Sequence, residues 1–157
     1  MAASVYIETT VISYLTARPS KDLIQQAHQR LTRKWWQNYR REFDLYISPL
    51  VLQEAAAGDP LRARRRLGIV KSLPVLDANL EVVRLARDLI NHGPIPKKAE
   101  VDALHIAIAA VHGLEYLLTW NCTHIANARM RSTIEMICRN ENYEPPVLCT
   151  PEELMEG

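Results

Sequence analysis

Several signatures of common protein classes are absent from this sequence of 157 residues. Its five glycines are scattered, so they form neither a dinucleotide-binding loop nor a Walker-type phosphate loop. No serine stands in a G-x-S-x-G turn, and the histidines form no H-E-x-x-H pattern. No apolar run approaches the length of a membrane span. These absences argue against nucleotide-loop enzymes, α/β-hydrolases, zinc proteases and membrane proteins.

Cysteine is also scarce, and its spacing is uninformative for metal binding. Cys122, Cys138 and Cys149 are odd in number, widely spaced and form no C-x-x-C pair, which argues against a structural zinc site. Such cysteines are typical of reduced thiols in the cytoplasm, and no signal-peptide pattern opens the chain. We therefore expect a cytoplasmic protein with a single domain over residues 1–157.

The net charge of +1 conceals an uneven distribution of charge. Residues 1–75 carry twelve Lys or Arg and six Asp or Glu, whereas residues 76–157 carry seven and twelve. Chance placement of solvated charges is one explanation. The alternative is a basic surface suited to a phosphate backbone, set near an acidic cluster suited to metal ions.

Short apolar segments alternate with longer amphipathic segments along the whole chain. The pattern predicts strands at about 4–7, 45–47, 75–76, 116–118 and 147–149. Helices are predicted at about 9–17, 21–41, 49–58, 60–71, 77–90, 97–112 and 129–140. This alternation indicates an α/β fold with a mostly parallel sheet of about five short strands and helices on both faces.

Two of these helices carry specific predictions. In the helix over 21–41, a four-residue repeat predicts one buried stripe formed by Leu23, Ala27, Leu31 and Trp35. Asp77 is predicted to cap the start of the helix over 77–90.

Three carboxylates stand where a charge is costly. Glu8 directly follows the first apolar strand, and the carboxyl ends of parallel strands are where α/β sheets bind ligands. Glu54 lies in a helix with little other charge, and Asp102 lies in the segment Val101–Ala110, which is apolar nearly all round. A buried charge of this kind finds a cation, coordinates a metal or shifts its pKa. For Asp102 the alternative is a first-turn acid favoured by the helix dipole.

Asn121 supplies a fourth polar group just past an apolar strand. Carboxylate and amide oxygens at one edge of a sheet suit Mg²⁺ or Mn²⁺. Such an ion binds phosphate oxygens and activates a water for attack.

Taken in order, Tyr6–Val11, Glu54, Asp102–Ala107 and Leu117–Asn121 resemble the PIN-domain family, and most closely the VapC-like toxins of bacterial toxin–antitoxin pairs. The resemblance spans essentially the whole chain. It implies a Mg²⁺- or Mn²⁺-dependent endoribonuclease that cleaves an RNA substrate. It also implies a homodimer and a small antitoxin protein as partner.

The resemblance assigns the four catalytic and metal-binding positions to Glu8, Glu54, Asp102 and Asn121. Two of them depart from the family pattern, because Glu8 stands where Asp is usual and Asn121 where Asp is frequent. The longer side chain and the missing charge are expected to weaken metal binding and catalysis.

Other residues are candidates for substrate contact. Thr9 and Thr10 could offer hydroxyls, although capping of the following helix is the favoured interpretation, and His124 could touch a phosphate or be a surface residue. His105 is interpreted as a packed or hydrogen-bonded helix residue. Two basic stretches could bind RNA or simply face solvent: the mixed basic and aromatic segment 30–41, and the patch of Arg62, Arg64, Arg65 and Arg66.

Two functions follow from these residues. The first is a metal-dependent endoribonuclease that hydrolyses RNA phosphodiester bonds, the toxin of a toxin–antitoxin pair. The alternative is a catalytically attenuated module that binds RNA or protein. Glu8 and Asn121 motivate this alternative, whereas Glu54 and Asp102 argue against it.

Overall fold

Four short parallel strands form the centre of the molecule. The computed structural model describes residues 2–155 and orders the strands β2-β1-β3-β4. Their bounds are β1 Ala3–Ile7, β2 Phe43–Tyr46, β3 Tyr116–Leu118 and β4 Val147–Cys149. All the neighbouring strands pair in parallel, which confirms the predicted α/β class.

The sheet has four strands where about five were predicted. Val75 forms only an isolated bridge with Ile47, supported by hydrogen bonds from Ile47 N to Pro74 O and from Leu76 N to Ile47 O. Pro74 has no N–H to donate, so the pairing does not extend into a further strand.

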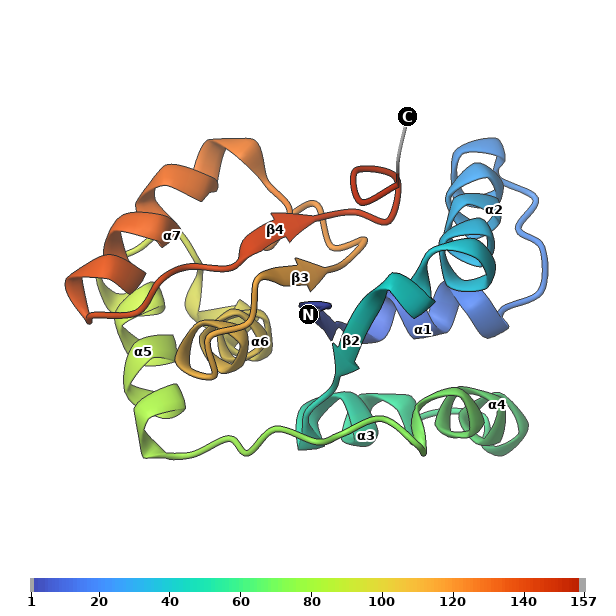
Figure 1. Ribbon diagram of the computed structural model, residues 1–157, viewed down its shortest axis with the longest axis horizontal. Coiled ribbons are helices and arrows are strands. Elements are labelled where there is room, and N and C mark those ends of the chain that lie inside the picture. Colours follow the sequence, from blue (N-terminus) through green and yellow to red (C-terminus); the bar gives the residue numbers. More distant parts are fainter. Residues whose placement is uncertain (1, 156–157) are drawn as a thin grey trace.

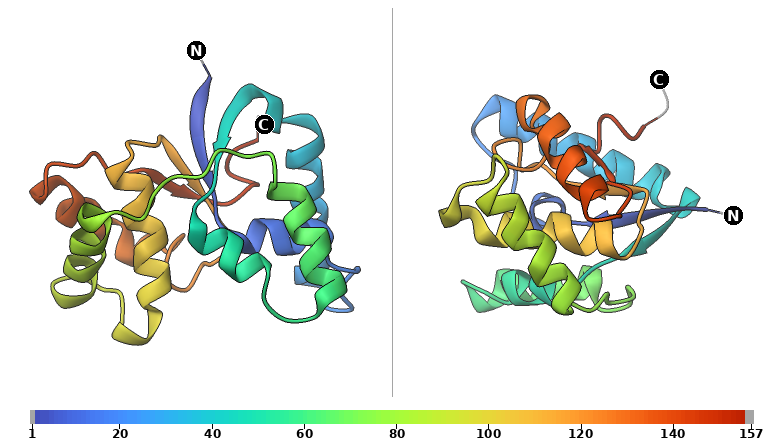
Figure 2. Two further views of the ribbon diagram at one scale, coloured as in Figure 1. Left: turned by 90° about the horizontal axis from the view of Figure 1, so that it is seen from below. Right: turned by 90° about the vertical axis from the view of Figure 1, so that its left-hand side faces the viewer.

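Helices lie on both sides of this sheet. Figure 1 shows α5, α6 and α7 gathered on the left and α1 to α4 on the right, and Figure 2 shows the same division in two further views. The helices are α1 Thr9–Thr16, α2 Leu23–Asn38, α3 Pro49–Ala55, α4 Pro60–Val70, α5 Leu80–Asn91, α6 Glu100–Val111 and α7 Ala128–Asn140. Short 3₁₀ turns at Arg40–Glu42 and Lys97–Ala99 precede β2 and α6. No helix in residues 2–155 has the length and apolar character needed to cross a membrane.

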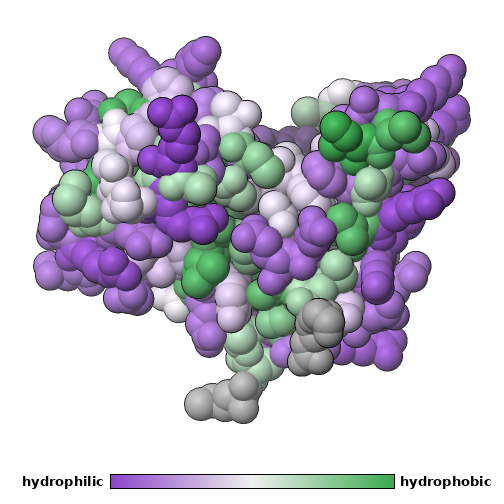
Figure 3. Space-filling view, turned by 90° about the horizontal axis from the view of Figure 1, so that it is seen from above, coloured by the Kyte–Doolittle hydropathy of each residue, from purple (hydrophilic) through white to green (hydrophobic). Residues whose placement is uncertain are grey.

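The buried face of α2 differs from the predicted stripe. Trp35 is buried as predicted, but the other buried residues are Gln29 and Thr32, and Leu23 is 79% exposed. Thr32 is fixed inside because its Oγ1 accepts a hydrogen bond of 2.7 Å from Nε1 of Trp120. This polar contact rotates α2 relative to the orientation that its apolar residues favour. Figure 3 shows the resulting apolar surface on the lobe that holds α2.

Side chains cap several helices at their first turn. Asp59 accepts from Arg62 N at the start of α4, and Pro49 and Pro60 open α3 and α4 as predicted. The prediction for Asp77 is wrong, because Asn79 caps α5 by accepting from Val82 N. Residues 76–79 form neither helix nor strand, so the helix begins at Leu80, later than predicted.

The register of the strands aligns their carboxyl ends. Ile7 pairs with Leu118, and Leu118 pairs with Cys149. Glu8 N then donates to Leu118 O, and Thr119 N donates to Cys149 O. Glu8 and Thr119 therefore leave the sheet side by side, at the edge where α/β folds bind their ligands.

Candidate functional site

Glu8 is a buried carboxylate at the carboxyl edge of the sheet. It is 3% exposed, and its Oε1 accepts hydrogen bonds from the hydroxyls of Thr10 and Thr119. Glu8 itself occupies the cap position of α1, and no side chain caps this helix. The favoured interpretation of Thr9 and Thr10 as capping residues is therefore wrong, because both hydroxyls donate to acids instead.

Glu54 approaches Glu8 from α3. Its Oε1 accepts from Thr9 Oγ1 at 2.6 Å and lies 2.8 Å from Nε2 of His105. Because a carboxylate can only accept, Nε2 carries the proton of this hydrogen bond. The side chain of Glu54 remains 40% exposed, so this acid is open to solvent while its position is fixed from inside.

His105 connects Glu54 to the interior. The imidazole on α6 is fully buried, and its Nδ1 lies 2.7 Å from the hydroxyl of Tyr6 on β1. The same hydroxyl lies 2.7 Å from Oγ of Ser48, which precedes α3. The chain of hydrogen bonds Ser48–Tyr6–His105–Glu54 therefore ties β1, α3 and α6 together behind the acid.

Ligand atoms of Glu8, Glu54 and His105 all lie within 4.8 Å of one another, and we call these residues the inner group. Among residues 2–155 this is the one such cluster of three or more Asp, Glu, His or Cys side chains. The two carboxylates are thus brought together as the sequence predicted, whereas Asp102 does not belong to this cluster.

Asp102 forms a second group with His124 and Asn121, the outer group. Asp102 Oδ2 lies 2.9 Å from Nδ1 of His124, and Asn121 Oδ1 accepts from the backbone N–H of His124 at 3.0 Å. Asp102 precedes His105 by one turn of α6, so the two groups are neighbours along one helix face. The side chains of Asp102 and His124 are 22% and 19% exposed.

The two inner carboxyls differ in their pKa. Burial raises the pKa of Glu8 above its usual range, although the hydrogen bonds from Thr10 and Thr119 and the nearby His105 oppose this. Burial also acts to raise the pKa of Glu54, but hydrogen bonds from His105 and Thr9 outweigh it and lower the pKa. Burial likewise raises the pKa of Tyr6, so its hydroxyl stays protonated. Glu54 is therefore the readily ionised acid, whereas Glu8 resists ionisation without a cation.

Sequence reasoning missed Tyr6, Ser48 and Thr119 as members of this site. Tyr6 stands in an apolar strand, and Ser48 directly precedes Pro49 at the start of α3, so neither residue stands out in the sequence. His105 is a hydrogen-bonded helix residue as interpreted, but its partner is Glu54. The spacing of Asp102 and His105, three residues apart on one helix, was the available signal.

The predicted arginine contacts lie farther along α4. Arg66 donates to the carbonyl oxygens of Ala55 and Ala57, so it stabilises the turn between α3 and α4. Arg62 and Arg65 line a cavity between α1 and α4. Separately, Figure 3 shows the surface hollowed between the lobe that holds α7 and the lobe that holds α2.

Comparison with known proteins identifies relatives of this architecture. A family model described as the PIN domain matches residues 5–121. No curated protein matches significantly. A toxin of Mycobacterium tuberculosis, VapC20, described as cleaving the Sarcin-Ricin loop, has a similar structure, with a TM-score of 0.57 and 15% identity over 76% of this chain and 91% of that chain. A chain of VapBC2 from Rickettsia felis, crystallised with a DNA fragment from its promoter, is also similar. Its TM-score is 0.55, and the identity is 16% over 83% of this chain and 92% of that chain. At these identities the likeness shows a shared fold.

Proposed function

The chain belongs to the PIN-domain family, and on this basis we propose that it is a metal-dependent endoribonuclease that hydrolyses RNA phosphodiester bonds. The observation that carries the proposal is the pairing of Glu8 and Glu54 at the carboxyl edge of the sheet. Two carboxylates brought together at this depth repel one another unless a proton or a cation lies between them. A divalent cation is the partner that this pair best fits.

The donor set favours Mg²⁺ or Mn²⁺. Glu8 and Glu54 supply carboxylate oxygens, which are the ligands that these ions prefer. Both nitrogens of His105 are engaged, one with Glu54 and one with Tyr6, so we assign the imidazole to positioning Glu54 and not to the metal. We assign Asp102 and Asn121 of the outer group to the remaining ligand positions, because Asp102 precedes His105 by one turn of α6.

When bound, the cation would lower the pKa of a water for attack on the phosphodiester and offset charge on the phosphate. The protein's own groups prepare this position. Thr10 and Thr119 hold Oε1 of Glu8, and Thr9 and His105 hold Oε1 of Glu54. Each acid is thus oriented by two donors through one oxygen, and Oε2 takes no part in these bonds. Preorganised ligands of this kind lower the entropic cost of metal binding.

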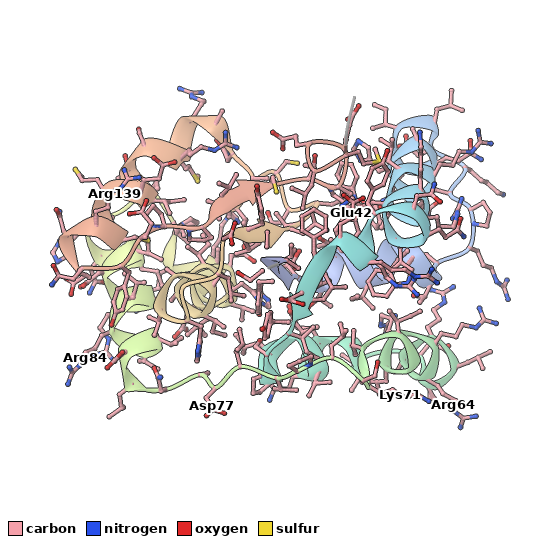
Figure 4. The ribbon with its side chains drawn as sticks, in the orientation of Figure 1. Glu42, Arg64, Lys71, Asp77, Arg84 and Arg139 are labelled. Carbon is pink, nitrogen blue, oxygen red and sulfur yellow. The ribbon has the colours of Figure 1, made fainter. Side chains whose placement is uncertain are left out.

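A cleavage assay tests the proposal. The wild type, incubated with an RNA hairpin and Mg²⁺ or Mn²⁺, is expected to cut the RNA and to stop when a chelator is added. Glu54→Gln keeps the shape of the side chain but removes its charge, and it is expected to abolish cutting. Glu42→Gln is the matched control, because Glu42 directly precedes β2 (Figure 4). It therefore lies at the amino end of a strand, whereas the acid pair lies at the carboxyl ends. Cleavage by Glu54→Gln at the wild-type rate would show that the assigned site is wrong.

We further propose that the protein is the toxin of a toxin–antitoxin pair, acts in the cytoplasm as a homodimer and is silenced by a small antitoxin protein. The structural likeness to VapC20 and to a chain of VapBC2 supports this. Expression of the protein is expected to arrest bacterial growth, and Glu54→Gln is expected to relieve the arrest. Chromatography of the purified protein with light scattering tests the dimer.

The alternative is an attenuated PIN module that binds RNA without cutting it. Two observations favour it: the buried Glu8, whose raised pKa disfavours the charged form, and the amide of Asn121 in place of an acid. Tight binding of RNA by the wild type, with no cleavage at any Mn²⁺ concentration, would establish this second function.

A further inference from the structure

A basic cavity of about 750 Å³ lies between the second half of α1 and the first half of α4. Its positive charge comes from Arg18, which follows α1, and from Arg62, Arg65 and Arg66 on α4. The hydroxyls of Ser13 and Thr16 line the opposite wall. Figure 1 shows α1 lying above α4, with α3 beside them.

The arginines of this cavity lack acidic partners. Within residues 2–155, neither Arg18, Arg62 nor Arg65 forms an ion pair. The one carboxylate in the lining, Asp59, accepts the backbone N–H of Arg62 as a helix cap. Arg66, the fourth arginine of the lining, donates to backbone carbonyl oxygens and not to an acid. Four guanidinium groups around one concavity repel each other, so the cavity is suited to an anionic ligand.

One face of α1 runs from the inner group, which it meets at Thr9, to this cavity, which it meets at Ser13 and Thr16. Thr9, Ser13 and Thr16 are spaced four and three residues apart, which places their hydroxyls on one side of the helix. Thr9 binds Glu54, whereas Ser13 and Thr16 line the basic cavity. Thr9 and Thr16 are seven residues apart in the sequence, which corresponds to about 10 Å of helix. At the stacked rise of about 3.4 Å per nucleotide, this is about three nucleotides of one strand.

We propose that this groove binds the sugar–phosphate backbone of the RNA strand on one side of the scissile phosphate. The inference rests on the proposed nuclease function and assigns the path of its substrate. Arg62 and Arg65 bind phosphate oxygens, and the hydroxyl of Ser13 hydrogen-bonds to the same backbone, whereas the hydroxyl of Thr16 donates to Ile12 O of its own helix. Because the groove reads charge and sugar and not bases, it contributes affinity without sequence preference.

An RNA strand fits these features better than an acidic peptide does. The hydroxyl-lined face leads directly to the acid pair, where a phosphodiester must lie for hydrolysis. An acidic peptide offers carboxylates to the arginines but no phosphodiester to the acid pair. The acids at the start of α1 and the arginines beside its second half thus match a phosphate backbone that reaches a metal-bound scissile position.

Binding without cleavage tests the groove separately from the catalytic site. The probe is a fluorescein-labelled uridine dodecanucleotide, measured by fluorescence anisotropy in a chelator at several salt concentrations. The double variant Arg62→Ala/Arg65→Ala is expected to raise the Kd at least about tenfold and to reduce the salt slope by about 1.4, since each phosphate contact on a single strand contributes about 0.7.

Arg64→Ala is the matched control on the same helix. Arg64 lines a different cavity, with Lys71, and Figure 4 shows it pointing away from α1. The Arg64→Ala substitution removes one positive charge, as each substitution of the double variant does. It is nevertheless expected to leave the Kd for RNA and the salt slope close to the wild-type values. Equal effects of the double variant and of Arg64→Ala would overturn the proposal, because they would reflect net charge alone.

The remaining outcomes also decide between occupants. If a glutamate decapeptide displaces the RNA from the wild type but not from the double variant, and the RNA slope is unaltered by the double substitution, the groove is a peptide site and the proposal is wrong. If RNA binding depends on Arg62 and Arg65 but no metal supports cleavage, the result supports the groove as an RNA-binding site and contradicts the proposed nuclease function.

Discussion

The inner and outer groups occupy the same edge of the sheet, yet their acids are held in opposite ways. Glu8 and Glu54 each accept two side-chain hydrogen bonds on one oxygen, from donors that come from different elements. Asp102 is held by His124 alone, near the surface. The inner acids are therefore preorganised, whereas Asp102 must exchange His124 for a metal or share it. The comparison suggests that the inner pair sets metal affinity and the outer group completes the site.

Removing one acid from each group is expected to give the largest effect. Glu54→Gln and Asp102→Asn should each reduce metal-dependent RNA cleavage by at least about 100-fold, because each removes a charged ligand. Initial rates at saturating Mn²⁺ measure this, with Glu42→Gln as control. If Asp102→Asn kept full activity while Glu54→Gln lost it, the outer group would lie outside the catalytic site. This result would contradict its assigned role in completing the metal site.

Removal of a single oxygen atom tests the hydrogen-bond chain Ser48–Tyr6–His105–Glu54. Tyr6→Phe removes one hydroxyl and leaves Ser48 and His105 Nδ1 without their partner. We expect Mn²⁺ affinity to fall about 10- to 100-fold and the free energy of unfolding to fall by about 1–3 kcal/mol. Calorimetry and urea denaturation measure the two quantities.

Tyr143→Phe is the control, since the hydroxyl of Tyr143 bonds to Glu81 on the surface. If Tyr6→Phe lost stability but kept its Mn²⁺ affinity, the chain would serve folding and not the positioning of Glu54.

The opposite pKa shifts of Glu8 and Glu54 predict opposite effects on stability in a chelator. The raised pKa of Glu8 gives stability that is present below about pH 4.5 and lost as the pH rises through its folded pKa. Glu8→Gln should therefore be more stable than the wild type at neutral pH, with an advantage that shrinks toward pH 4.5.

The lowered pKa of Glu54 gives stability that is present above about pH 4.5 and lost as the pH falls through its folded pKa. Glu54→Gln should be less stable than the wild type at neutral pH, and the difference should disappear in acid. Urea denaturation from pH 4 to 7 measures both curves. Parallel curves for the two variants would contradict the assigned environments.

The smallest expected effect concerns His124. His124→Ala frees Asp102 from its present partner, so Mn²⁺ affinity should rise by less than about tenfold. A fall in affinity as large as that of Asp102→Asn would mean that His124 itself contributes to the metal site.

The sequence predicted the acids better than it predicted what holds them. Glu8 and Glu54 were recognisable because a carboxylate at a strand end or in an uncharged helix is unusual. Tyr6 and Ser48 were not, since a tyrosine in an apolar strand and a serine before a proline have ordinary structural explanations. Their role depends on the contacts of Tyr6 with Ser48 and with His105. These residues lie 42 and 99 positions from Tyr6 in the sequence, and no local pattern encodes such contacts.

Long-range contacts also explain the other differences. Asp102 was expected beside Glu8 and Glu54, but the loop after β3 places His124 against it, held by Asn121. The buried face of α2 follows the contact of Thr32 with Trp120, which overrides the apolar repeat of the helix. The alternation of strands and helices, in contrast, is a local property, and it predicted the parallel α/β fold correctly.

Mn²⁺ binding in the absence of RNA tests the central claim most directly, namely that Glu8 and Glu54 together hold a divalent cation. Isothermal titration calorimetry of the wild type, Glu8→Gln, Glu54→Gln and Glu42→Gln gives the four affinities under one condition. We predict that Glu42→Gln binds like the wild type and that each of the other two variants binds at least about tenfold more weakly. Equal affinity in all four proteins would contradict the claim.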